Sequence, residues 1–117
     1  MGKFYLKAGD TGTALQMTLK NPDGSVHDLT GEAAYLHISL NDEVTKLTRN
    51  MTIVDAANGV VQYPWVAGDW GTGADKIPRA KGIHLMEVEA LGAKRTTFPN
   101  KGFDSLVVEA DIADGGP

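Results

Sequence analysis

The stretch TALQMTLKNPDGSVHDL, residues 13–29, indicates the kind of fold that this chain adopts. From Leu15 to Leu19, apolar residues alternate with polar ones, which is the period of two expected for a strand with one buried face. Pro22 and Gly24 then suit a β-turn, because proline presets its own φ and glycine tolerates a positive φ. The stretch therefore predicts a strand that turns back on itself as a hairpin.

Strand signals recur along the rest of the chain, either as the same alternation or as richness in β-branched residues. The further segments are LTGEAAYLHISL (29–40), VTKLTRNMTIVDA (44–56), VVQYPW (60–65), IHLMEVEAL (83–91) and SLVVEADI (105–112). Turn-forming residues separate them, and no helical period competes. The pattern predicts an all-β chain folded as an immunoglobulin-like two-sheet antiparallel β-sandwich of about seven or eight strands. We expect one domain over residues 1–112 and a tail at 113–117, where ADGGP is typical of a tail or linker.

The composition excludes several classes of function. The chain has no cysteine, which excludes disulfides, thiolate zinc sites and cysteine nucleophiles. Its net charge is -4 and its basic residues are scattered, so nucleic acid is not an expected partner. No run of about 18 apolar residues is present, so no membrane span is expected.

Histidines and carboxylates offer no catalytic or metal-binding pattern. His27, His37 and His84 are not spaced as metal ligands usually are, and each falls within a strand pattern. Glu87 and Glu89 share one strand face, whereas glycosidases need two carboxylates that straddle a bond in a cleft. We therefore expect no enzyme activity and no cofactor.

A calcium site and a serine nucleophile were the remaining chemical alternatives. Asp10, Asp69 and Asp75 lie near glycines and could supply loop oxygens to calcium, but they lack EF-hand spacing, and turn formation explains them better. No serine stands in a G-x-S-x-G elbow. The sequence thus predicts neither a metal site nor a nucleophile.

The stretch DAANGVVQYPWVAGDW, residues 55–70, holds three of the chain's eight aromatic residues, including both tryptophans. Tyr63 and Trp65 share a strand face with Val61, which favours a buried position. Trp70 instead falls in a glycine-rich segment, residues 67–82, which we expect to be a long loop with an exposed tryptophan that anchors a partner. The predicted partner contacts are Trp70, Asp69, Lys76 and Arg79.

Four short motifs carry a resemblance to a known family. They are DLTG (28–31), the D-x-x-x-G-x-V-x-Y pattern (55–63), Gly82 before an alternating strand, and PNKGFDSLVV (99–108). In this order they resemble the N-terminal domain of phage baseplate upper proteins, a small β-sandwich family, over roughly residues 8–112.

The resemblance implies an architectural function. It implies a structural protein of the virion of a tailed phage, located in the tail or baseplate, that joins other tail and baseplate proteins and forms a homo-oligomer in a symmetric assembly. Because the start MGKFYLKAGD lacks the apolar region of a signal peptide, we expect synthesis in the host cytoplasm. The chain stops just after the domain, which favours a stand-alone virion component. The alternatives are a capsid decoration protein and a carbohydrate-binding β-sandwich that uses Tyr63, Trp65 and Trp70.

Overall fold

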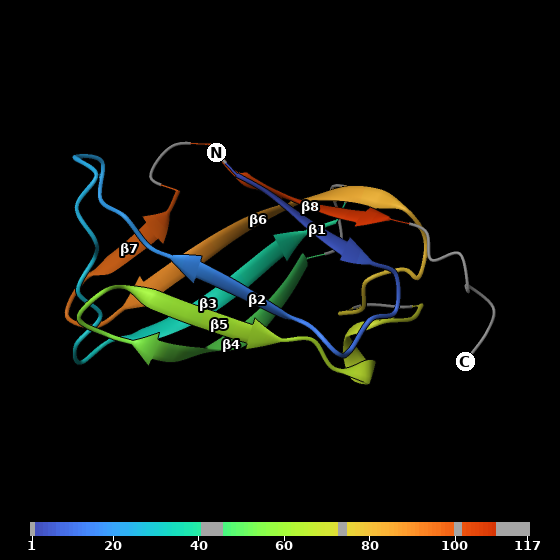
Figure 1. The fold of residues 1–117 in the computed structure, drawn as a ribbon, viewed down its shortest axis with the longest axis horizontal. Coiled ribbons are helices and arrows are strands. Elements are labelled where there is room, and N and C mark those ends of the chain that lie inside the picture. The colour runs from blue at the N-terminus through green and yellow to red at the C-terminus, as the bar shows by residue number, and fades with distance from the viewer. Residues whose placement is uncertain (1, 41–45, 73–74, 100–101, 110–117) are drawn as a thin grey trace.

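A computed structural model describes residues 2–40, 46–72, 75–99 and 102–109, which are drawn in colour in Figure 1. These residues form eight strands and one 3-10 turn. The elements are β1 (Lys3–Lys7), β2 (Ala14–Thr18), β3 (Ala33–Ser39), β4 (Lys46–Asp55), β5 (Val60–Pro64), η1 (Ala67–Asp69), β6 (Gly82–Leu91), β7 (Arg95–Phe98) and β8 (Asp104–Glu109).

The strands form a single mixed sheet in the order β1-β8-β6-β3-β4-β5-β2, with β7 paired to the end of β6. β1 runs parallel to β8, and every other pair of neighbouring strands is antiparallel. The sheet curls into a nearly closed, barrel-like form, so that β1 and β2, its two end strands, both face the viewer in Figure 1. The barrel is left open between them.

The prediction of an all-β chain with seven or eight strands is confirmed, but the two-sheet antiparallel sandwich is wrong. The physical reason lies in β4, which pairs with β3 along its first half and with β5 along its second half. A register shift between Ile53 and Asp55 bends it, so the sheet turns a corner instead of ending. Sandwiches and barrels bury the same alternate residues, and alternation therefore did not distinguish them.

Alternate residues of the strands fill the interior as the sequence predicts. In β3, Ala34, Leu36 and Ile38 are buried, while the residues between them face outward. Val61, Tyr63 and Trp65 are buried as well, which confirms the core interpretation of VVQYPW. The rest of the core comes from the other strands and the connecting segments, including Leu6, Leu15, Met17, Leu29, Leu47, Met86, Val88, Phe98 and Leu106.

Two turns that the sequence predicts, one at Gly24 and one at Gly59, are present in the structure. Gly24 has a φ of 90° and donates its backbone N–H to the carbonyl of Asn21 at 2.9 Å, which closes the predicted turn. Gly59 has a φ of 68°, and a Cβ there would stand 2.6 Å from the carbonyl oxygen of His27. Only glycine fits this crossing, where the 55–59 turn packs against the chain that leaves β2.

Three other expectations from the sequence either differ from the structure or concern residues that the structure does not describe. β1 was not predicted, because Tyr5 stands between Phe4 and Leu6 and interrupts the alternation of apolar with polar residues. The segment 44–56, expected as one or two short strands, contains a single strand of ten residues. The predicted tail at 113–117 and the last predicted domain residues, 110–112, lie outside the described residues. Among the residues that are described, no helix is long and apolar enough to cross a bilayer.

Candidate interaction surfaces

The carboxylate of Asp69, at the end of η1, is the centre of a buried hydrogen-bond network. Asp69 is only 2% exposed. Its Oδ1 accepts from Arg49 Nε at 2.8 Å and from the Tyr63 hydroxyl at 2.8 Å, and its Oδ2 accepts from the Val66 backbone N–H at 2.9 Å. A loop carboxylate thus ties together β4, β5 and the segment that follows β5.

Arg49 extends this network to the far side of the loop. Its Nη1 donates to Asp75 Oδ1 and its Nη2 to the Asp75 carbonyl, both at 2.7 Å. Burial lowers the pKa of the guanidinium, but the hydrogen bonds to Asp69 and Asp75 outweigh that effect and raise it. Burial first, and then the Asp69 contact, raise the pKa of Tyr63 to about 12. In this network arginine stays cationic and tyrosine stays neutral.

Trp70 is buried, which corrects the expectation of an exposed loop tryptophan. Its indole N–H donates to the Asp10 carbonyl at 3.0 Å, and its ring lies 6.5 Å from that of Trp65. Trp65 in turn meets Tyr63 edge-to-face at 5.2 Å. The three aromatic residues therefore form one internal cluster, and the loop folds inward because this cluster and Asp69 offer it both apolar and polar partners.

Only part of the predicted contact set reaches the surface. Asp69 and Trp70 are buried, so the exposure on which their contact role rested is absent. Lys76 is half-buried and donates its ammonium to the Gly68 carbonyl at 2.7 Å, while Arg79 is exposed. The exposed loop was predicted from the glycine content of the segment, and glycine indicates turns without indicating whether they pack inward. Partner contact by Lys76 and Arg79 stays a prediction.

The histidines are engaged in local structure. His27 Nε2 lies 2.7 Å from Glu32 Oε1, and His37 Nε2 lies 2.8 Å from Glu89 Oε1. His84 is buried within the core. The three side chains are not gathered, and no group of three or more metal-ligating side chains is found in the part of the chain that the structure describes.

Three of the acidic residues considered for catalysis or calcium, Glu89, Asp69 and Asp75, are held in ion pairs. Glu89 is held between His37 and Arg95, whose Nε lies 2.8 Å from Glu89 Oε2. Asp69 and Asp75 share Arg49, so each carboxylate already faces a cation. These residues therefore form ion-pair networks that link the elements of the fold.

An exposed apolar surface, which sequence reasoning missed, covers the outer side of β1, β8 and β6. We call it the outer apolar face; its members are Tyr5, Ile83, Leu85, Phe103 and Val107. Tyr5 is 64% exposed and Ile83 is 60% exposed. Both are in register with the half-buried Val107, which lies between them on β8. Contiguous exposed apolar side chains of this kind mark protein-binding surfaces.

Comparisons with known proteins give one informative similarity. No family model and no curated protein sequence matches the chain. Among solved structures, the N-terminal domain of ORF48 of phage TP901-1 has a similar fold, with a TM-score of 0.50 and 10% sequence identity. The match covers 94% of this chain and 85% of that chain. The likeness establishes a shared fold over nearly the whole of both chains.

Proposed function

We propose that this chain is a structural protein of a tailed bacteriophage that binds neighbouring subunits in the tail or baseplate. The observation that carries the proposal is the fold, which the chain shares over 94% of its length with the N-terminal domain of a phage protein. The sequence resemblance to baseplate upper proteins supports the same conclusion from a different kind of observation, since it rests on turn motifs. In the DLTG motif, for example, Asp28 Oδ1 accepts from the backbone N–H and the hydroxyl of Thr30.

The outer apolar face supplies the surface that such a function needs. Tyr5, Ile83 and Val107 lie in register across three strands, so they present a continuous apolar row on a rigid sheet. Interfaces draw much of their binding free energy from aromatic and aliphatic side chains at their centre. Other tail or baseplate proteins, and further copies of this chain in a symmetric assembly, are the proposed partners.

Sugar binding is a weaker alternative because its supporting residues are buried. Tyr63, Trp65 and Trp70 pack against one another inside the barrel. A sugar ring would need an exposed aromatic platform, and none of the three side chains provides one. Capsid decoration uses the same kind of surface as tail assembly, so the location of the chain in the particle has to distinguish them.

Mass analysis of purified virions tests the proposed function. We expect the chain in the tail fraction after tails are separated from capsids, and we expect a deletion mutant to make particles that lack a functional tail tip. Absence of the chain from virions would overturn the proposal, as would infectious deletion particles with normal tails. Recovery of the chain with the capsid fraction alone would support the decoration alternative and contradict a tail location.

A matched pair of surface variants tests the outer apolar face. Ile83→Asp places a charge in the middle of the face, whereas Val54→Asp places one on an equally exposed valine of β4 outside it. Both positions are exposed, so both variants should keep the free energy of unfolding within about 0.5 kcal/mol of the wild type. We expect only Ile83→Asp to lose incorporation into virions. Equal incorporation of the two variants would contradict a role for this face.

A further inference from the structure

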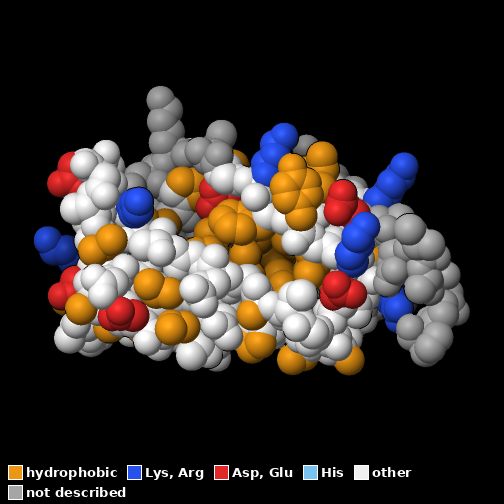
Figure 2. Space-filling view, in the orientation of Figure 1, with side chains coloured by type: hydrophobic (Ala, Val, Ile, Leu, Met, Phe, Trp, Pro, Cys, Tyr) orange, Lys and Arg blue, Asp and Glu red, His pale blue; other side chains and the backbone are white. Residues whose placement is uncertain are grey.

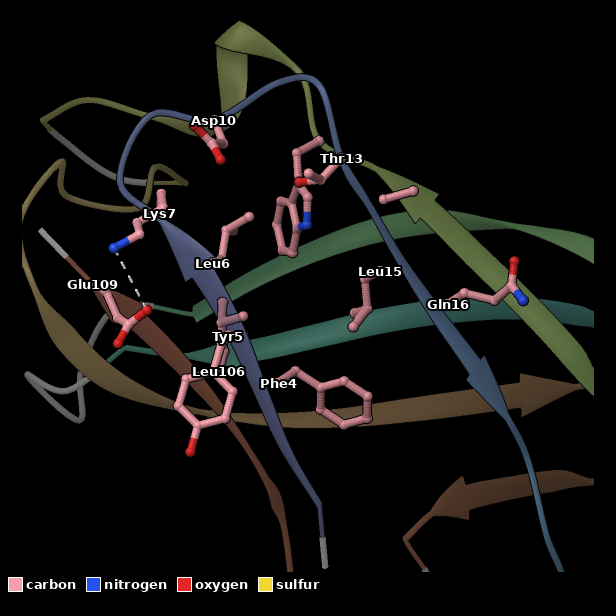
Figure 3. A pocket seen from close by; sticks show the side chains of 12 residues that line it. Phe4, Tyr5, Leu6, Lys7, Asp10, Thr13, Leu15, Gln16, Leu106 and Glu109 are labelled. Atoms are coloured by element: carbon pink, nitrogen blue, oxygen red, sulfur yellow. Dashed lines mark ion pairs between the residues drawn. The ribbon is translucent and has the colours of Figure 1, made fainter. Parts of the chain in front are cut away.

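The two end strands of the sheet border an open groove, which we call the open seam. It lies between β1 and β2, which are not paired with each other. A hollow of about 470 Å³ occupies it, lined by both strands. A second hollow of about 460 Å³ continues it past Phe4 and Gln16 toward Lys20. Figure 3 shows the side chains of both strands around the first hollow.

On the β2 side, backbone groups point into the open seam. Trp65 donates its backbone N–H to the carbonyl of Thr13, and Leu19 donates its own to the carbonyl of Gly59. The odd-numbered residues of β2 therefore bond to β5, and in an antiparallel ladder the residues between them point the other way. The residues that offer N–H and C=O groups to the open seam are Ala14, Gln16 and Thr18.

The β1 side offers a second row of backbone groups. Ser105 donates its N–H to the Gly2 carbonyl, and Ala8 donates its N–H to the Glu109 carbonyl, both at 2.9 Å. The even-numbered residues of β1 therefore face β8, and the intervening residues face the open seam. These residues are Lys3, Tyr5 and Lys7, of which Lys7 already gives its carbonyl to Asp10 N–H at 3.1 Å.

The floor of the open seam is apolar. The side chains at its base come from β1, β2, β8 and the end of β5, namely Phe4, Leu6, Leu15, Leu106 and Trp65. Figure 2 shows an apolar, orange hollow that is visible from outside, between the regions occupied by β1 and β2 in Figure 1. An occupant must therefore satisfy two rows of backbone groups and cover an apolar floor. An extended polypeptide does both, because its backbone pairs sideways while alternate side chains point down.

The two edges differ in how well they are protected against strand addition. Natural sheets protect their edges with lysine, proline or bulges. β1 carries the outward-facing Lys3 and Lys7, whereas β2 exposes only uncharged side chains and pairs with β5 without a register shift. β2 is thus the receptive edge. At the far end of β2, Lys20 is exposed and lines the second hollow, which favours an acidic side chain at that end of whatever binds. Asp10 and the ion pair of Lys7 with Glu109 line the other end, where an uncharged side chain fits better.

We propose that the open seam binds an extended segment of another protein as an added β-strand against β2, with an acidic residue beside Lys20. β1 and β2 contribute five residues each, so about five residues of the segment would pair, with apolar side chains on the floor and the acidic residue facing out at the Lys20 end. The added strand completes the barrel. The inference rests on the proposed function only for the source of the segment, which is a neighbouring subunit.

Peptide titration of the isolated chain, followed by amide NMR, tests the open seam independently of any virion. The probe is a capped seven-residue peptide that alternates valine with threonine and carries glutamate at one end, and its matched control carries lysine in place of that glutamate. A third peptide repeats the acidic sequence with alternate backbone nitrogens methylated, which removes donors from one edge. We expect saturable shifts at Ala14, Gln16 and Thr18 with the acidic peptide at about millimolar affinity. The lysine and methylated peptides should bind about tenfold more weakly, about 1.4 kcal/mol.

A variant of the receptive edge completes the test. Gln16→Pro removes one donor that faces the open seam and leaves the β2–β5 ladder intact, so it should weaken acidic-peptide binding about tenfold while keeping the fold. Four outcomes would overturn the proposal: no saturable shifts, equal binding of the lysine peptide, unchanged binding to Gln16→Pro, or shifts at these amides that depend on protein concentration without peptide. The last outcome would identify a second copy of the chain as the occupant.

Discussion

Two regions of the molecule differ in whether their polar groups have hydrogen-bond partners within the chain. They are the loop after β5, residues 66–77, and the open seam between β1 and β2. In the described part of the loop, Asp69, Trp70 and Lys76 each find a hydrogen-bond partner within the same chain. In the open seam, a row of backbone N–H and C=O groups on β2 faces an exposed groove. Polar side chains of the irregular segment have partners within the chain, whereas backbone groups of a regular strand face outward into a groove.

The difference shows that accessibility follows from hydrogen-bond satisfaction rather than from the type of secondary structure. In the described part of the loop, the buried Asp69 carboxylate accepts from Arg49, Tyr63 and Val66, so this buried group needs no partner from outside the chain. A strand at the end of a sheet keeps half of its backbone groups unpaired by geometry alone. Variants of the loop should therefore destabilise the fold more than variants of the open edge.

Trp70→Ala should cause the largest loss of stability. The side chain is 7% exposed and packs beside Trp65, so truncation leaves a cavity in the aromatic cluster and removes the hydrogen bond to the Asp10 carbonyl. We expect the free energy of unfolding to fall by about 4 kcal/mol, the usual range for buried tryptophan. Urea denaturation measures it. Trp70→Phe, which keeps an aromatic ring, should cost less than half as much, and a loss below about 1 kcal/mol for the alanine variant would show that Trp70 is an exposed contact residue after all.

Asp69→Ala should follow with a loss of about 3 kcal/mol, because it leaves the Arg49 guanidinium partly buried beside an unsatisfied Tyr63 hydroxyl. The matched control is Asp75→Asn, at the exposed end of the same arginine, where asparagine also tolerates the φ of 67°. We expect that control to cost at most about 1 kcal/mol. Equal losses in the two variants would contradict a buried centre at Asp69.

Tyr63→Phe should cost about 1 kcal/mol through the lost hydrogen bond to Asp69, and it also has a pH signature. The pKa of Tyr63 is raised from 10.0 to about 12 in the folded chain, so folding favours the neutral phenol. The resulting stability is complete below pH 10 and is lost as the pH rises toward 12. Denaturation at several alkaline pH values should show a steeper decline for the wild type than for Tyr63→Phe. Parallel declines would mean that other groups cause the alkaline loss.

The sequence was sufficient for those parts of the fold that depend on neighbouring residues. The alternation in β3 and β6 identified their buried faces, and the turns at Gly24 and Gly59 followed from residue types. These features are local, so propensity and period determine them. The aromatic run in β5 was likewise recognised as core from its spacing.

The parts that were missed depend on contacts between distant residues. β1 is short and gains its place only by pairing with β8, about a hundred residues away in the chain. Asp69 is buried because Arg49 comes from another strand, and nothing next to Asp69 in the sequence announces that partner. The outer apolar face joins Tyr5 to Ile83 through Val107, again across the whole chain. Single-sequence reasoning cannot pair such residues, and it therefore missed the outer apolar face.

Gln16→Pro should have the smallest effect on stability, within about 0.5 kcal/mol, and it tests the open edge directly. The backbone N–H of Gln16 faces the open seam, so proline removes no bond from the β2–β5 ladder. Met17→Pro, one residue along, is the matched control: its N–H faces β5 and its side chain is buried, so it should cost about 3 kcal/mol or more. Thermal and urea denaturation of the pair measure the contrast. Similar losses at the two positions would mean that Gln16 N–H has a partner across the seam, and β2 would then not be an open edge in solution.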